Sequence, residues 1–323
     1  MKKCLFLMLL LFSIKVFGQT PYVVSTQSAE EKAIVKELTE EEKFVRDNFD
    51  KINIADWHRG MRFMAVYKKD IIDISKLKSK NGKGLHNYYH QIITVDTVLE
   101  RKVECPKGLC TRTYITFDTQ DGNVLEYEYI GDRSELRNAK VGNSIEGIAY
   151  LKDVDTAKKM LLGKTLYAMV NSGYYDVEDG KMRVAKIKKF APYIVQSIGV
   201  GNSECPVKII AKNTDGTEIA FLVAFSGVNK PYCGFINGNG YFYDVFMFLN
   251  PKLKYKNIPS SIWNLIMNGR VQRGMTKEQC RLSWGNPENI NVTTGSFGTH
   301  EQWVYGLDSY LYFENGKLTT IQN

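Results

Sequence analysis

The stretch Gly274-Met-Thr-Lys-Glu-Gln-Cys-Arg-Leu-Ser-Trp-Gly-Asn-Pro287 carries the clearest local structural signals in this 323-residue chain. Thr276, followed by Gln279, forms a capping box, in which each side chain bonds the backbone N–H of the other residue. This pattern predicts a helix over 277–284, and Gly285 is the residue expected to end it. Cys280 falls inside that helix, where we expect it to pack as a small buried hydrophobic residue.

The residues on either side extend this helix into a small α+β module. Upstream, Ser260 is expected to cap a short helix with one apolar face, which ends near Gly269. Downstream, the alternating residues of 301–305 and 311–322 predict strands that reverse at Asn315-Gly316, a dipeptide suited to a tight turn. Residues 256–323 are therefore predicted to form two helices and a three-stranded sheet, with Trp303 in the core between them.

Three motifs of this module follow one another in the order known from one protein family. Gly274-Met-Thr276 precedes the second helix, Gly285-Asn-Pro287 follows it, and the aromatic strand Glu301-Gln-Trp-Val-Tyr305 leads to a hairpin. On these residues the segment resembles the BamE-like (SmpA/OmlA) family of envelope modules. The resemblance covers about a fifth of the chain and implies a two-helix, three-strand sandwich that makes protein contacts at the outer membrane. Such a fold does not by itself fix a function.

The N-terminus has the three parts of a secretory signal. Lys2 and Lys3 supply positive charge, residues 5–14 are apolar, and Gly18 is the small residue before the expected cleavage. We therefore interpret 1–18 as a signal peptide and expect a periplasmic or extracellular protein. Association with the outer membrane is compatible with this location. The apolar run is too short to span a bilayer and no comparable run follows, which predicts no integral membrane segment. Cys4 precedes the apolar run, which argues against a lipid anchor.

The charge balance excludes an obvious nucleic-acid partner. The formal net charge of +8 becomes +5 when the three lysines of the signal peptide, Lys2, Lys3 and Lys15, are removed. The densest basic cluster, 186–189, is short and has no accompanying nucleic-acid motif. It is either a solvated strand face or a patch for an anionic ligand.

The cysteines outside the signal peptide suit an oxidising compartment. Cys105 and Cys110 enclose four residues that include Pro and Gly, and we predict that a disulfide closes a short hairpin there. Cys205 and Cys233 are candidates for a second disulfide, which leaves Cys280 free. A zinc site needs closer pairs than these, and a redox-active pair needs a shorter spacing, so we predict neither a metal nor a cofactor.

Corresponding segments in the middle of the chain indicate a diverged tandem repeat. Four pairs of segments correspond: 60–66 with 163–169, 92–95 with 194–197, Glu104-Cys-Pro106 with Glu204-Cys-Pro206, and Asp121-Gly122 with Asp215-Gly216. Their offsets of 103, 102, 100 and 94 residues drift as loop insertions would make them drift. We predict two small β-modules, 57–150 and 151–255, each preferably an SH3-like barrel. A flexible segment and helical lead-in, 19–56, precede them. Thr39 with Glu42 is a capping box of this lead-in, and we expect Glu40-Glu-Glu42 to be a solvated first turn rather than a calcium or partner site. The predicted fold class is mainly β with α+β.

No residue pattern indicates catalysis. His86 and His90 are spaced like two ligands on one helical face, but they lack the glutamate of a metalloprotease motif and are expected to be ordinary polar residues. His58 and His300 have no nearby nucleophile in sequence, although a catalytic triad can assemble in space. We therefore predict no catalytic residue and treat the chain as a non-enzyme.

Aromatic residues around 237–240 are the candidate binding surface. Tyr232, Tyr241 and Tyr243 could stack on a sugar or peptide, or could simply pack in a core, and Trp303 is a further candidate contact. Three functions follow: an exported envelope protein that contacts other proteins, which we favour, a binder of cell-wall glycan or peptide, and a hydrolase whose site lies between modules. The oligomeric state cannot be inferred from the sequence.

Overall fold

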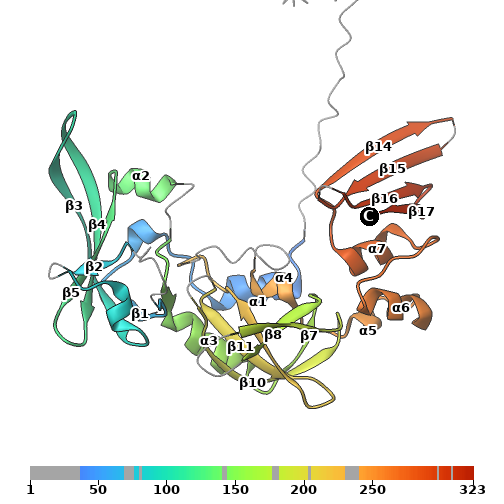
Figure 1. Cartoon of the computed structure of the whole chain (residues 1–323), viewed down its shortest axis with the longest axis horizontal. Coiled ribbons are helices and arrows are strands. Elements are labelled where there is room, and N and C mark those ends of the chain that lie inside the picture. The colour runs from blue at the N-terminus through green and yellow to red at the C-terminus, as the bar shows by residue number, and fades with distance from the viewer. Residues whose placement is uncertain are drawn as a thin grey trace, which may run out of the picture. The chain divides into compact units, whose positions relative to one another are not determined.

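The computed structural model describes residues 37–68, 76–79, 82–139, 144–176, 182–202, 205–229, 240–296, 298–306 and 308–323. Strands make up 42% and helices 22%, so the predicted mainly β class is confirmed (Figure 1). The described elements belong to the unit Leu38–Asn323. The signal-peptide prediction, Tyr232 and Cys233 lie outside the described residues. Within the described ranges, no helix has both the length and the hydropathy needed to cross a bilayer.

The first sheet has the strand order β2-β5-β4-β3-β1-β6. Its strands are β1 (Arg62–Ala65), β2 (Lys78–Ser79), β3 (Ile92–Cys105), β4 (Gly108–Thr119), β5 (Val124–Tyr129) and β6 (Ile148–Tyr150). The short helices η1 (Ile54–Asp56), η2 (Leu85–Tyr88) and α2 (Arg133–Asn138) accompany it. Trp57, Phe63 and Phe117 are buried at the centre of its core, with ring centroids 4.6 to 6.3 Å apart. Such aromatic burial is the main favourable term for a small sheet.

The second sheet has the order β13-β7-β10-β11-β12-β8-β9. Its strands are β7 (Thr165–Ala168), β8 (Ser172–Asp176), β9 (Met182–Lys186), β10 (Pro192–Val200), β11 (Val207–Lys212), β12 (Glu218–Val223) and β13 (Phe246–Met247). The helices beside it are α3 (Leu151–Leu161), α4 (Phe242–Val245) and α5 (Pro251–Lys254). Helix α3 contacts β10, and its Val154, Ala157 and Leu161 enter the core.

The two sheets share their strand order. Read from one edge, β6-β1-β3-β4-β5-β2 corresponds to β13-β7-β10-β11-β12-β8, with β9 added at the end of the second sheet. Both also have a register shift at the same place, between Val95 and Thr97 in β3 and between Val195 and Ser197 in β10. Different strand orders would have contradicted the predicted repeat. The origin of the modules by duplication, their exact boundaries and an SH3-like form remain predictions; the sheets are curled, and one forms a half-barrel.

One of the four sequence correspondences is not a structural one. Cys105 ends β3, before the hairpin turn, whereas Cys205 follows the turn of the second hairpin and lies just before β11. The second hairpin is shorter: Asn202 N–H donates to the Cys205 carbonyl (2.9 Å) at the place that Lys102 and Thr111 occupy in the first. The shared Glu-Cys-Pro letters are therefore coincidental.

Segments that lie next to one module in the sequence pack in the core of the other module. Helix α1 (Glu40–Asn48) precedes the first module, and its Thr39 capping box is confirmed. The following Phe49 nevertheless stacks on Phe225 of the second core, with centroids 4.4 Å apart. Conversely, Val228 is buried in the first core. Glu41, expected in a solvated turn, is buried and accepts the Phe248 N–H (2.8 Å).

The C-terminal module contains α6 (Ser260–Met267), α7 (Lys277–Trp284) and a sheet of β14 (Asn289–Gly295), β15 (Gly298–Val304), β16 (Tyr310–Glu314) and β17 (Lys317–Gln322) in that order. The predicted second helix and its Thr276–Gln279 capping box are confirmed. The turn at Asn315-Gly316 has the expected positive φ angles, 48° and 82°. Two details were wrong: Pro259, not Ser260, is the N-cap residue of α6, and β14 makes the sheet four-stranded. Membership of the BamE-like family stays a prediction.

Lys189 and Phe190 fasten this module to the second sheet. Phe190 is buried in the C-terminal core, with its ring centroid 6.0 Å from that of Trp263. Lys189 is only 8% exposed, and its Nζ donates to the Ser283 carbonyl (2.7 Å) near the end of α7. A cation at a helix C-terminus is favourable, while burial lowers the pKa of Lys189 to about 8. The prediction that all of 186–189 is a solvated face or anion patch is therefore wrong for Lys189.

Candidate functional site

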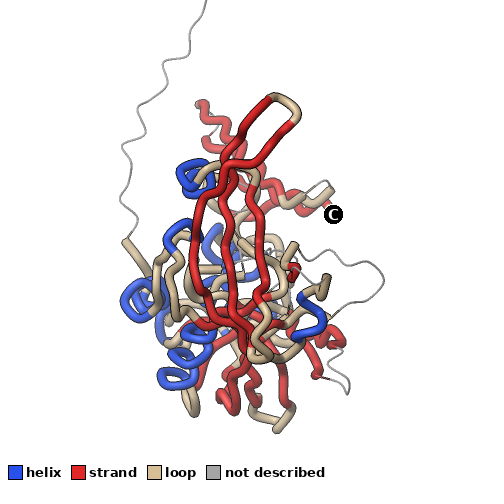
Figure 2. Tube along the Cα trace, turned by 90° about the vertical axis from the view of Figure 1, so that its left-hand side faces the viewer, coloured by secondary structure: helices blue, strands red, loops and turns tan. Residues whose placement is uncertain are grey.

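The β3–β4 hairpin is the most specialised feature of the first module. It continues beyond the length of the equivalent β10–β11 hairpin by three residue pairs: Val103 with Cys110, Glu104 with Leu109, and Cys105 with Gly108. We call residues 103–110 the hairpin tip. Figure 2 shows the long hairpin rising beyond the rest of its sheet. The added length lies within the tip that the disulfide closes.

The Cys105–Cys110 disulfide predicted from the sequence is confirmed, with the two Cα atoms 6.0 Å apart. A loop this short gains about 2 kcal/mol from the cross-link in the chain-entropy treatment. An isolated two-residue turn at the end of a long hairpin would otherwise fray, because no third strand pairs with it. The disulfide therefore keeps the tip in one conformation.

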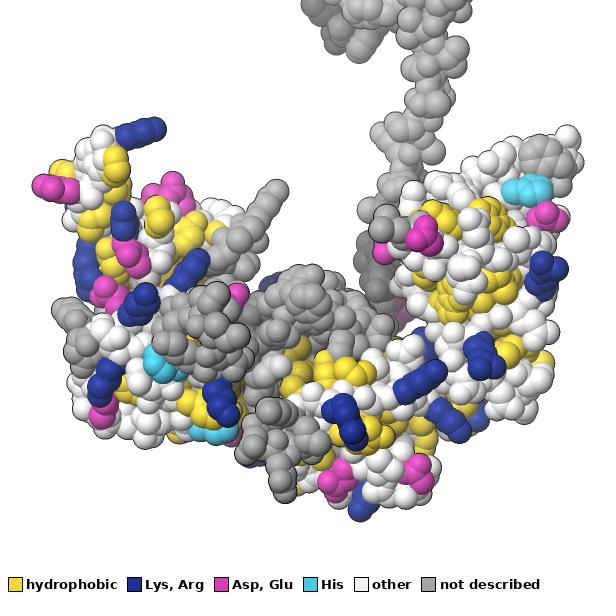
Figure 3. Space-filling view, viewed as in Figure 1, with side chains coloured by type: hydrophobic (Ala, Val, Ile, Leu, Met, Phe, Trp, Pro, Cys, Tyr) yellow, Lys and Arg dark blue, Asp and Glu magenta, His cyan; other side chains and the backbone are white. Residues whose placement is uncertain are grey.

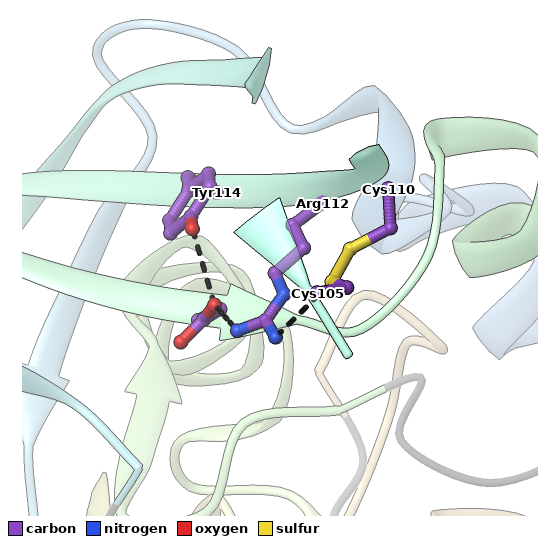
Figure 4. The surroundings of a disulfide bond; sticks show 5 residues. Cys105, Cys110, Arg112 and Tyr114 are labelled. Atoms are coloured by element: carbon purple, nitrogen blue, oxygen red, sulfur yellow. Dashed lines mark hydrogen bonds and ion pairs between the residues drawn. A yellow bond between two sulfur atoms is a disulfide. The ribbon is translucent and has the colours of Figure 1, made fainter. Parts of the chain in front are cut away.

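A network of side chains stiffens the hairpin below the tip (Figure 4). Arg101 and Arg112 face each other across β3 and β4, and like charges in that position repel. Each is neutralised from β5: Arg101 by Glu126 (2.7 Å) and Arg112 by Glu128. The Arg112 guanidinium also holds the pKa of Glu128 below its usual value. The like-charge repulsion is thereby offset.

Tyr114 is the centre of this network. Its hydroxyl donates to Glu128 (3.1 Å), and the Arg101 guanidinium lies 4.3 Å from its ring centroid. Burial and then the Glu128 carboxylate raise the pKa of Tyr114, so the hydroxyl keeps its proton and acts as a donor. Arg112 in turn reaches the Cys105 sulfur at 3.8 Å. The disulfide and the ion pairs therefore form one connected support.

The tip presents an apolar residue among charges, and Figure 3 shows yellow, dark blue and magenta side chains together at the upper end of the hairpin on the left of the view. Leu109 is 74% exposed, and Lys107, two positions before it, is exposed as well. The flanking Lys102 and Glu104 are also exposed. A large aliphatic side chain held in water on a rigid support is a surface available to a partner.

A second candidate site is a cleft of about 400 Å³ beside the N-terminus of α3. Its lining residues are Asp50, Ile52, His58, Arg59, Gly60, Met61, Arg62, Tyr150, Leu151, Lys152 and Asp155. Tyr150 and Lys152 donate to the two carboxylate oxygens of Asp50, at 2.9 and 2.8 Å. Burial favours protonation of Asp50, but these bonds outweigh it and lower its pKa. Asp50 is thus an anion already held by its neighbours.

The hydrolase hypothesis needs a histidine, an acid and a nucleophile in one cleft. This cleft brings His58 near Asp50, and the charge of His58 contributes to lowering the pKa of Asp50. Among the residues that line it, however, no Ser, Thr or Cys stands beside them. Burial also raises the pKa of Tyr150, which keeps this hydroxyl protonated. The cleft is therefore an ionic junction without the triad that the hypothesis requires.

The predicted aromatic contacts have different outcomes. Tyr241 and Tyr243 are both partly exposed and stack on each other, with centroids 5.1 Å apart and an interplanar angle of 13°. Tyr232 lies outside the described residues. Trp303 is fully buried, with its Nε1 donating to Glu301 (2.9 Å) and its ring 4.5 Å from that of Phe313. The binding role predicted for Trp303 is therefore corrected to packing in the core.

Of the remaining cysteines, the two that the structure describes are in the predicted states, and the predicted Cys205–Cys233 pairing stays a prediction. Cys205 is disulfide-bonded, and Cys233, its predicted partner, lies outside the described residues. Cys280 is free and buried, and burial raises the pKa of its thiol to about 12. This environment makes Cys280 unreactive.

Sequence reasoning missed the ionic cluster of the cleft and the length of the hairpin. Asp50 and Tyr150 are 100 residues apart, so no local motif announces their contact. The hairpin length had no clear signal in the sequence either, because Glu100-Arg-Lys102 and Thr111-Arg-Thr113 interrupt the alternation of polar and apolar residues. Comparison with known proteins adds no relative: no family model, no curated protein and no solved structure matches the chain.

Proposed function

We propose that this chain is an exported binding protein of the bacterial envelope, which contacts another protein through the hairpin tip of its first module. The observation that supports this most strongly is the disulfide-closed, ion-pair-supported hairpin with Leu109 exposed at its end. A preorganised loop loses little conformational entropy when it binds, which is the usual means by which a small contact gains affinity.

The state of the cysteines supports export. Of the cysteines that the structure describes, Cys105, Cys110 and Cys205 are in disulfides, and only the buried Cys280 is free. Disulfides persist in oxidising compartments such as the periplasm and are rare in the cytosol. Together with the N-terminal pattern at 1–18, this favours an exported protein over an intracellular one.

The chemistry of the tip indicates the kind of partner. Leu109 requires an apolar pocket, and the exposed Lys102 and Lys107 favour a pocket with carboxylates at its rim. We propose that the C-terminal module, through its resemblance to BamE-like modules, provides a further protein contact in the envelope. The two contacts use separate modules, which would increase avidity for one partner or assembly.

The test is capture of envelope proteins by the chain from Gln19 to Asn323, compared with tip variants. Leu109→Asp removes the apolar contact, and the double variant Cys105→Ser with Cys110→Ser removes the cross-link. Leu253→Asp is the matched control, since Leu253 is 65% exposed on α5, away from the tip. A specific partner should be lost, by about tenfold or more, with Leu109→Asp and retained with Leu253→Asp. Equal loss or equal retention by the two variants contradicts the proposal.

A second candidate, binding of cell-wall glycan, is favoured by the Tyr241–Tyr243 stack. The two parallel rings cover one face of each other, and the parts of Tyr241 and Tyr243 that stay exposed are the aromatic surface on which a sugar ring would pack. The corresponding test is retention on purified peptidoglycan by the wild-type chain and by Tyr243→Ala. Retention that depends on Tyr243 and not on Leu109 would favour this function over the first.

A further inference from the structure

The free edge of the C-terminal sheet is formed by β14. Among the described strands, the sheet order β14-β15-β16-β17 leaves β14 with one neighbour, and Figure 1 shows it at the margin of the sheet. All seven residues of β14, Asn289–Gly295, are exposed. The strand contains no charged residue and no proline. Charged residues and proline are the usual features that prevent an edge strand from pairing with another chain.

The hydrogen-bonding pattern shows which residues of β14 face the open edge. Asn315 N–H donates to the Thr299 carbonyl (2.9 Å), so the backbone groups of Thr299 point toward β16. The direction of the backbone N–H and C=O groups alternates from one residue of a strand to the next. The N–H and C=O groups of His300 and Gln302 therefore point toward β14. Their partners are Thr293 and Asn291. By the same alternation, the N–H and C=O groups of Ile290, Val292 and Thr294 point away from β15, into the open edge.

The side chains of β14 add an apolar component to this edge. Ile290 lies opposite Trp303, which is fully buried, so both side chains are on the face of the sheet that carries the core. Val292 is on the same face because it is two residues further along. Ile290 and Val292 are 37% and 58% exposed. The core face of the sheet thus continues uncovered onto its edge strand.

We infer that β14 pairs with β14 of a second copy of this chain. In an antiparallel pair centred on Asn291, Ile290 of each copy lies opposite Val292 of the other. Residues 290 and 292 are those whose backbone groups face the edge, so this register forms the hydrogen-bonded pairs on both sides of the centre. It joins four aliphatic side chains on the core face. No like charges oppose each other, since Glu288 lies opposite Thr294.

Self-complementarity selects this occupant over a foreign strand. A partner strand would need its own matching pattern, whereas the second copy supplies it by two-fold symmetry. The two sheets then become one continuous sheet across the dimer axis, and the exposed edges are removed. This inference is independent of the proposed function, because the hairpin tip belongs to another module.

The register makes the inference testable by cross-linking. Residue 291 lies opposite itself as a pair without hydrogen bonds, where Cα atoms are about 4.5 Å apart, within the range of a disulfide. Asn291→Cys is therefore expected to form a covalent dimer under mild oxidation. Asn289→Cys is the matched control, because in this register it is displaced from its symmetry mate by about 13 Å. The buried Cys280 does not compete.

A solution measurement completes the test. The mature chain should show a concentration-dependent doubling of molar mass by light scattering, up to about 100 μM. Val292→Pro removes an edge-facing N–H without removing a bond to β15, and is expected to give a monomer, as is Val292→Lys; Leu253→Lys should still dimerise. A wild-type chain that stays monomeric, or Cys variants that cross-link equally at 289 and 291, overturns the inference. The inference is also overturned if a peptide of another sequence protects the β14 amides from hydrogen exchange while the chain remains monomeric.

Discussion

Replacement of Asp153 by Asn is expected to change how the stability of this protein depends on pH. Asp153 is buried on α3, and its Oδ2 accepts the Ser226 hydroxyl (2.6 Å) and the Ser226 N–H (3.3 Å). Burial raises the pKa of this carboxyl from 3.8 to about 7. The charge of Asp50 raises it further, and that of Lys152 lowers it. An Asn side chain keeps an acceptor for Ser226 and cannot ionise.

The sign of the effect follows from proton binding. Between about pH 4 and pH 7, the unfolded chain has lost the Asp153 proton and the folded chain has kept it, so rising pH favours unfolding. The penalty grows by about 1.4 kcal/mol for each pH unit and reaches about 4 kcal/mol above pH 7. Asp153→Asn removes this penalty, so the variant gains stability over the wild type as pH increases.

The assay is urea unfolding of both proteins, followed by tryptophan fluorescence. The difference in unfolding free energy should widen by about 3 kcal/mol between pH 5 and pH 8 in favour of Asp153→Asn. Asp155→Asn, an exposed change on the same helix, corrects for the loss of a negative charge near α3. A difference between Asp153→Asn and the wild type that does not vary with pH refutes the argument.

Other consequences concern the segments between modules and the free thiol. Phe49→Ala is expected to lower the unfolding free energy by about 3 to 5 kcal/mol, because it removes the ring stacked on Phe225; an unchanged urea midpoint would contradict this packing. Asn229→Ala removes three hydrogen bonds to Ile145 and Ile148 and should cost about 1 to 3 kcal/mol by the same assay. Cys280 should react with a thiol reagent only in denaturant, and rapid labelling of the native chain would disprove its burial.

Local rules predicted the parts of the fold in which neighbouring residues determine the backbone. The capping boxes at Thr39 and Thr276 and the turn at Asn315-Gly316 are present as predicted. Each depends on a side chain that bonds a backbone group within three residues, or on a residue that tolerates positive φ. The Cys105–Cys110 disulfide belongs to the same class, since the turn brings the two sulfurs together.

Strand β14 escaped prediction because its composition opposes it. Asn and Gly are uncommon in strands, and Asn289, Asn291 and Gly295 are three of its seven residues, so the alternation of Ile290 and Val292 alone is too short to indicate a strand. It forms a strand because β15 offers a row of backbone partners in a hairpin. Pairing with β15 therefore overrides the weak strand propensity of these residues, and all seven of them remain exposed.

Contacts between distant segments could not be inferred from one sequence. Phe49 was assigned to a helical lead-in for the first module, but the second core provides the site into which its ring packs. Lys189 was grouped with exposed lysines, although the C-terminal module covers it. Periodicity identifies which residues are buried, but not against which module they are buried.

The candidate site was only partly predictable for the same reason. The cross-link of the hairpin tip follows from Cys105 and Cys110, whereas its support by Glu126 and Glu128 requires the pairing of β4 with β5. Trp303 shows the opposite error, because an aromatic residue in an alternating strand fits a surface contact and a core position equally well. Only the sheet and helices around it place it in the core.

The most direct test of the proposed function is site-specific photo-crosslinking in the envelope of the intact cell. A photoreactive amino acid is placed at position 109 on the hairpin tip and, as the control, at position 253 on α5. We predict a discrete covalent adduct with one envelope protein from position 109, which disappears when Cys105 and Cys110 are both replaced by Ser. The absence of an adduct at 109, or the same adduct from both positions, would contradict a binding role for the tip.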